Sequence, residues 1–254
     1  MSPFRVRRLA YPLLGFAVIV LIWQGYVETF HVSKVILPSP WDIVIVSVER
    51  YDLLLKEAWP TFLESVYGFG LALLVGIPLA VCVASSRILN LTIYPILIAT
   101  QSVPKVAVAP IILVWVGLGL GSKLVIAFLV AFFPIVVDTT TGLRATPPGF
   151  LELARSLRAS KWQMFWKVQF PAALPFVFSG AKVAVTLAVI GAVIGEFVGS
   201  VVGLGELLLS ANAQLDGPLA WAALVWLSVL GILLFSAVVL AEKLLMPWAE
   251  AQHP

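Results

Sequence analysis

The sequence predicts an all-α protein that crosses a membrane about six times. Of its 254 residues, 61% are hydrophobic and only 11% are charged, a composition far more apolar than that of an ordinary soluble domain. A helix needs about 20 residues to cross the roughly 30 Å of bilayer hydrocarbon. The chain can therefore supply five or six crossings with short loops, and little length remains for a soluble enzyme domain.

The first predicted membrane helix covers about 11–28, within an N-terminal segment of residues 1–35. Three arginines precede its apolar run, as in a signal peptide. The run is followed by Gln24 and Glu28 and not by a small-residue cleavage site. We therefore expect a helix that is retained and starts in the cytoplasm.

Residues 36–60 mix prolines, acids and bases with apolar residues. They are too polar to face lipid over their full length and too apolar for a flexible linker. We expect an amphipathic segment on the periplasmic surface. The core domain, 61–254, then carries the remaining apolar stretches, which cover about 61–84, 91–117, 123–138, 172–197 and 219–246.

The stretch 91–117 differs from the others because Pro95, Pro104 and Pro110 lie inside it. Each proline removes a backbone donor and disfavours continuous helix. In a membrane, such a break persists only where protein or a water-filled cavity satisfies the freed carbonyls. We expect this segment to line the interior of the bundle and to turn, at the glycines of 117–121, into the next helix.

The distribution of Lys and Arg predicts the orientation. With the N-terminus inside, most of the 16 basic residues lie in or next to cytoplasmic regions, whereas only Lys34, Arg50, Lys56 and Lys123 lie clearly outside. This pattern indicates a multi-pass membrane protein with both termini in the cytoplasm. The single cysteine, Cys82, lies in an apolar run and is expected to be buried.

A polar cytoplasmic loop, 144–171, separates the fourth and fifth membrane helices. The sequence FLELARSLRA places apolar residues at helical spacing, which predicts a short helix. Ser160 and Gln163 form a capping-box pattern, so a second helix should begin at Ser160, and Phe170-Pro171 should end it. Two short helices joined at a bend, with small and apolar residues exposed, indicate docking into a groove of another protein.

The spacing of this loop resembles the EAA loop of ABC-importer permeases. The motif reads Glu152-Leu153-Ala154, three residues, Arg158, nine residues and then Val168-Gln169-Phe170-Pro171. Leu153 stands where the family has Ala, and Arg158 stands where it has Gly. Because that Gly usually forms the turn between the two helices, a longer first helix is an alternative.

Shorter pieces resemble the branch of nitrate, sulfonate, taurine and pyrimidine-precursor permeases. The resemblance runs from about residue 36 to the C-terminus and implies a type I importer fold with a cytoplasmic coupling helix. Its pieces are Leu37-Pro38-Ser39-Pro40, the run from Val103 to Gly119, Pro171-Ala172-Ala173-Leu174-Pro175, and Gly195-Glu196-Phe197-Val198-Gly199-Ser200 with Gly203-Leu204-Gly205.

The resemblance also implies the partners. They are a second permease copy, two cytoplasmic ATPase subunits and a periplasmic binding protein that delivers a small organic or oxyanion solute. The chain has no GxxxxGK[ST] phosphate loop, so ATP and Mg should be bound and ATP hydrolysed by the partner ATPase. We expect no enzyme activity and no cofactor in this chain. The residues expected to contact the ATPase are Glu152, Leu153, Ala154, Arg155, Ser156, Leu157, Arg158, Ala159 and Ser160.

Four polar residues within membrane segments are candidates for the translocation pathway: Gln101, Lys105, Lys182 and Glu196. A lysine in a weakly screened cavity would attract an anionic solute, but snorkelling to a surface is the alternative for Lys105 and Lys182. Glu196 could instead cap a helix or pair with a neighbour at the periplasmic gate. Neither His31 nor His253 has other ligand-type residues nearby in the sequence, so no metal site is expected.

A secondary transporter or channel driven by an ion gradient is the alternative function. Such a protein should carry several intramembrane acids and an internal repeat of hydrophobic segments. In this sequence Glu196 is nearly alone and no repeat is visible.

Overall fold

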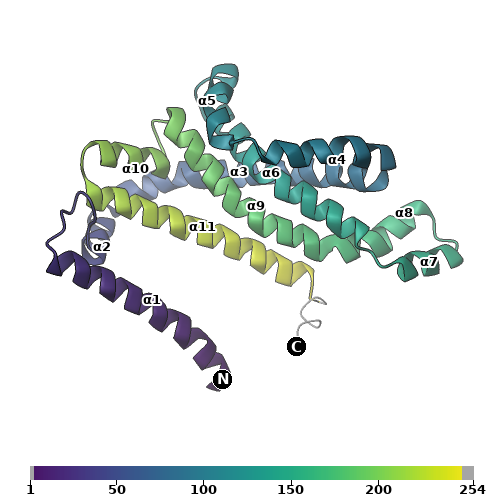
Figure 1. Cartoon of the computed structure of the whole chain (residues 1–254), viewed down its shortest axis with the longest axis horizontal. Coiled ribbons are helices and arrows are strands. Elements are labelled where there is room, and N and C mark those ends of the chain that lie inside the picture. The colour runs from purple at the N-terminus through teal and green to yellow at the C-terminus, as the bar shows by residue number, and fades with distance from the viewer. Residues whose placement is uncertain (1–2, 248–254) are drawn as a thin grey trace.

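The computed structural model describes residues 3–247; residues 1–2 and 248–254, which include His253, lie outside the described part. Between residues 3 and 247 the chain is helical and contains no strand. Its elements, drawn in Figure 1, are α1 (Pro3–Thr29), α2 (Pro40–Glu49), α3 (Tyr51–Ser85), α4 (Arg87–Gln101), α5 (Lys105–Val116), α6 (Leu120–Arg144), α7 (Pro148–Ser156), α8 (Lys161–Met164), the π-helix η1 (Phe165–Gln169), α9 (Phe170–Gly199), α10 (Leu204–Ala213) and α11 (Gly217–Leu245).

Four long helices, α3, α6, α9 and α11, run side by side and form the bundle (Figure 1). Small residues line the contacts between them, such as the fully buried Ala131, Ala184 and Ala188. A Cβ on Gly191 of α9 would lie only 2.6 Å from the Ala127 Cα of α6. Glycine and alanine therefore let these backbones approach closely, which is how helices associate in a membrane where no hydrophobic drive exists between them.

Four helical stretches of the described chain are long and apolar enough to cross a membrane: Tyr51–Ser85, Leu120–Arg144, Lys161–Gly199 and Gly217–Leu245. The pair α4 and α5 adds a fifth if it is counted as one broken span. The remaining predicted crossing corresponds to α1, whose apolar stretch Leu14–Thr29 is shorter than the 18 residues required of a candidate span. By length and composition, the structure thus supports four or five spans where the sequence predicted about six.

The predicted break in 91–117 is present, but at one place. Helices α4 and α5 are bent by 102° relative to each other, and Pro104 caps α5 with an extended backbone (φ −63°, ψ 102°). Pro95 and Pro110 lie inside their helices. The glycine turn is also present, because Gly117 (φ 89°) and Gly119 (φ 133°) link α5 to α6 in conformations that L side chains rarely adopt.

Two sequence expectations were wrong in this region. Residues 51–60, expected to belong to the surface segment 36–60, are the first turns of α3. Their charge misled the prediction, because Glu57 is 9% exposed and accepts a hydrogen bond inside the bundle. Cys82, expected to be buried, is exposed on α3.

Helix α2 forms the short surface element that the sequence predicted within 36–60. Ser39 and Asp42 make a capping box at its start. The Lys34 ammonium lies 2.7 Å from the Asp42 Oδ1 and lowers the pKa of that carboxyl below its usual value, with a smaller contribution from Ser39. The Trp41 N–H also donates to the Gln24 Oε1 at 3.2 Å, and this hydrogen bond links α2 to α1.

Candidate functional site

Helices α7 and α8 project from one end of the bundle, between α6 and α9 (Figure 1). Helix α7 starts directly after Pro147 with Pro148 in its first turn, where the missing N–H costs nothing. Ala154 is buried at 8% exposure, whereas Leu153 and Leu157 are 58% and 74% exposed. The helix therefore packs by one small residue and presents apolar side chains outward.

The turn after α7 is a Schellman motif centred on Arg158. The Ala159 N–H donates to the Ala154 carbonyl at 3.0 Å, and the Arg158 N–H donates to the Arg155 carbonyl at 2.9 Å. Arg158 has a φ of 53°, the left-handed conformation that glycine adopts most easily. The loop thus keeps the turn of a glycine-containing EAA loop, and the alternative of a longer first helix is wrong.

Helix α8 begins as predicted from its capping box. The Ser160 hydroxyl accepts from the Gln163 N–H at 3.2 Å, and the Gln163 side chain accepts from the Ser160 N–H at 2.9 Å. The expected end at Phe170-Pro171 is wrong, because the helix continues through η1 into α9 as one stretch, Lys161–Gly199. The π-turn widens the backbone just before Pro171, and this relieves the clash that a proline ring makes in a regular α-helix.

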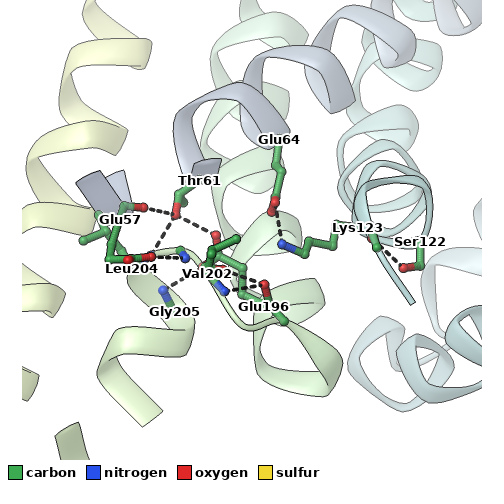
Figure 2. Close-up of polar contacts among 12 residues, drawn as sticks. Glu57, Thr61, Glu64, Ser122, Lys123, Glu196, Val202, Leu204 and Gly205 are labelled. Carbon is green, nitrogen blue, oxygen red and sulfur yellow. Dashed lines mark hydrogen bonds and ion pairs between the residues drawn. The ribbon is translucent and has the colours of Figure 1, made fainter. Parts of the chain in front are cut away.

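A cluster of buried polar side chains lies at the opposite end of the bundle, where α3 and α9 meet the start of α10 (Figure 2). The Thr61 hydroxyl donates to the Glu196 Oε1 at 2.6 Å and accepts from the Leu204 N–H at 2.9 Å. The Gly205 N–H donates to the Glu196 Oε2 at 2.6 Å. We call this the polar cluster; its members are Glu57, Thr61, Glu64, Lys123, Glu196 and the backbone of 203–205.

The polar cluster caps α10 with carboxylates from two other helices. Besides the Glu196 contact, the Gly203 N–H donates to the Glu57 Oε2 at 2.7 Å. Negative charge is favourable at a helix N-terminus, where backbone donors are free. Gly203 has a φ of 114°, and a Cβ there would overlap the Glu196 carboxylate. The arrangement holds α10 against α3 and α9.

An ion pair completes the polar cluster between α3 and α6. The Lys123 Nζ lies 2.7 Å from the Glu64 Oε1, and the two side chains are only 7% and 2% exposed. The sequence analysis missed Glu57, Thr61, Glu64 and Lys123 as members of one site. A signal was present, because the three residues of α3 recur at helical spacing of four and three and so share one face.

The four pathway candidates do not form one site. Glu196 is 1% exposed and caps α10, as one of its alternatives required. Lys182 on α9 pairs with Glu242 on α11 at 2.6 Å. Gln101 ends α4 and is exposed.

Lys105 stands at the bend between α4 and α5, beside a cavity. Its Nζ lies 5.3 Å from the centre of the Phe133 ring, in a cation–π contact. The cavity, about 240 Å³, is lined by Lys105, Thr100, Phe133 and aliphatic side chains of α5 and α6. Of the four candidates, only Lys105 is among the residues that line this cavity.

The sequence matches a known family of transport proteins. Residues 72–246 match the family described as "Binding-protein-dependent transport system inner membrane component". The chain belongs to this family. The permease is therefore a multi-pass protein of the inner membrane, and this membership decides against the ion-gradient alternative.

Curated relatives over nearly the whole chain are permeases of ABC transporters. The permease is 35% identical to the formylaminopyrimidine transport permease protein ThiX of Halalkalibacterium halodurans, over 95% of this chain and 96% of the relative. It is 35% identical to the riboflavin transport system permease protein RibX of Chloroflexus aurantiacus, over 96% and 93%. A putative aliphatic sulfonates transport permease protein of Bacillus subtilis is 32% identical, over 92% and 86%.

A solved structure has the same fold. A chain of the MetNI methionine ABC transporter, in an inward-facing conformation, superposes with a TM-score of 0.67 at 24% identity, covering 77% of this chain and 97% of that chain. The predicted all-α fold of type I importers is thereby confirmed. The chain is a transmembrane permease subunit of an ABC transporter for a small solute.

Proposed function

We propose that the permease forms the translocation pathway of an importer as a homodimer, with two cytoplasmic ATPase subunits and a periplasmic binding protein. ATP and Mg bind to the ATPase subunits, and the permease catalyses no covalent chemistry. ATP binding closes the ATPases, the loop 144–171 moves with them, and the pathway changes the side to which it opens. Family membership supports this scheme, since a binding-protein-dependent system needs a protein that delivers solute.

One observation carries the proposal: an exposed α7 stands at the spacing of the EAA loop and ends in a Schellman turn. Glu152, Leu153 and Leu157 are exposed on it, and the continuous helix from Lys161 to Gly199 joins the loop to the bundle. The turn at 157–160 separates α7 from this helix, so a displacement of α7 that carries α8 with it would pass along the continuous helix into α9. We assign the ATPase contact to residues 152–160.

The solute is a small organic molecule or oxyanion of the sulfonate, taurine, nitrate or pyrimidine-precursor type. The names of relatives support this range, among them a nitrate import permease of a Synechocystis strain and a taurine permease of Escherichia coli. Lys105 provides a cation at a cavity, which favours an anionic group on the solute. Glu196 and Lys182 act through packing, since both are held by protein partners.

The orientation follows from the position of the basic residues. Helix α1 begins, and α11 ends, toward the same side of the bundle as α7 and α8 (Figure 1). That side also carries Arg87, Arg144 and Lys167. By the positive-inside rule it faces the cytoplasm, and both termini lie there.

The proposal is tested by Leu153→Asp, which places a charge on the exposed face of α7 without touching the bundle. We expect this variant to lose the ATPase subunits that co-purify with tagged wild-type permease in mild detergent, and to lose ATP-driven uptake. Leu215→Asp is the matched control for ATPase retention, because Leu215 is 66% exposed at the opposite end of the molecule, between α10 and α11. Unchanged ATPase retention by Leu153→Asp would overturn the assigned contact surface.

A further inference from the structure

A second cavity lies between the bundle and the coupling helices. It measures about 580 Å³ and is lined by the last turn of α3, the end of α6, and residues of α7, α8 and η1. Ser85 and Leu143, which line it, lie at the ends of two candidate membrane spans. On the proposed orientation, which this inference takes from the proposed function, the cavity lies near the cytoplasmic surface of the bilayer.

The lining of this cavity combines two cations with apolar side chains. Arg155 and Lys161 supply the charge, Val81, Leu143 and Phe165 supply apolar surface, and no Asp or Glu is among the lining residues. Neither cation has a carboxylate or hydrogen-bond partner among the residues whose side chains the structure describes. Two uncompensated cations thus face one cavity.

Aromatic side chains mark the same level. Trp162 and Trp166, 70% and 46% exposed, pack edge to face with their ring centres 5.5 Å apart. The ring centre of Trp166 also lies 5.1 Å from the ring centre of Phe170. Exposed tryptophans of this kind lie in the headgroup layer of a bilayer, where an apolar ring with a polar edge is favoured.

We propose that this cavity binds the headgroup of an anionic phospholipid. The phosphate pairs with Arg155 and Lys161, and the start of the acyl chains lies against the apolar wall formed by α3 and α6. Basic pockets between helices at the cytoplasmic surface attract anionic lipids for this electrostatic reason. The bound lipid fills the space between the bundle and α7–α8 and supports the loop from the membrane side.

Lys161 is the residue to change, because Arg155 also belongs to the proposed ATPase contact. Lys161 is exposed in the first turn of α8, so its replacement leaves the packing of the bundle unchanged. Lys167 is the matched control, since it is an exposed lysine of η1 that does not line the cavity. Lys161→Arg keeps the positive charge and should keep the affinity for the anionic lipid.

Native mass spectrometry of the detergent-solubilised permease, titrated with phosphatidylglycerol or phosphatidylcholine, measures the binding directly and requires no transport. With two cations at the phosphate, the wild type should prefer phosphatidylglycerol by about 30-fold. Lys161→Ala should lose about five-fold in affinity for phosphatidylglycerol, and Lys167→Ala should lose little.

Three results would overturn the proposal. One is equal binding of the two lipids by the wild type, and another is equal loss in Lys161→Ala and Lys167→Ala, which indicates only a general attraction of lipid to basic protein. The third is displacement of the lipid by dissolved glycerol 3-phosphate, which would make the site one for a soluble phosphate. The comparison of phosphatidylglycerol with phosphatidylcholine binding uses the wild type alone, so it tests the proposal even if a variant fails to fold. None of these results depends on the proposed ATPase contact.

Discussion

The loop formed by α7, α8 and η1 and the polar cluster at the other end of the bundle are built in opposite ways. In the loop, every capping contact joins residues no more than five apart, such as Ala154 with Ala159. In the polar cluster, Thr61 meets Glu196 across 135 residues, and Glu57 meets Gly203 across 146. The loop is exposed and the cluster is buried. The difference indicates a surface element shaped by local sequence and a fixed end anchored by long-range polar contacts.

The strongest test of this contrast is Glu64→Leu. Removing one partner leaves the Lys123 ammonium buried and unpaired, which should cost about 3–5 kcal/mol of stability. The double variant Glu64→Leu with Lys123→Met replaces the pair by apolar groups and should recover most of that loss. Thermal unfolding of the detergent-solubilised protein measures both. If the double variant were as unstable as the single one, the ion pair would not be the cause.

A smaller effect is expected for Thr61→Val, which keeps the shape of the side chain and removes its hydroxyl. Glu196 loses a donor and the Leu204 N–H loses an acceptor, so we expect a loss of about 1–3 kcal/mol. Thr186→Val is the control, because the hydroxyl of the half-buried Thr186 donates to the Val183 carbonyl of its own helix. If the two variants lowered the unfolding temperature equally, the hydroxyl of Thr61 would contribute no more to stability than one bonded within its own helix.

The smallest effect is expected in the loop, from Arg158→Gly. Glycine adopts the left-handed conformation at this position without a Cβ penalty, so the turn should gain about 1 kcal/mol. Hydrogen exchange at the Ala159 amide, which donates across the turn, should slow by about five-fold. Arg158→Ala removes the charge but keeps the Cβ, and it should show no such gain. Equal protection in both variants would indicate that charge, and not backbone strain, governs the turn.

The accuracy of the sequence predictions follows the division between local and long-range contacts only in part. The capping box at Ser160 depends on two residues three apart, and it was correct. The end at Phe170-Pro171 was wrong, since the local rule for proline does not include a π-turn that absorbs the ring. The assignment of 51–60 to a surface segment failed for another reason: Glu57 has a buried partner that lies far away in the sequence.

The sequence by itself determined the helical membrane class, the family, the turn at Gly117 and Gly119, and the start of α8 at its capping box. Each of these rests on composition or on residues a few positions apart, where backbone and side-chain preferences act directly. Only the tertiary structure decided that Glu196 caps α10, that Lys123 pairs with Glu64, and that Arg155 and Lys161 face one cavity. Such contacts depend on how the helices are rotated and packed against one another, and the spacing of residues within a single helix does not specify that.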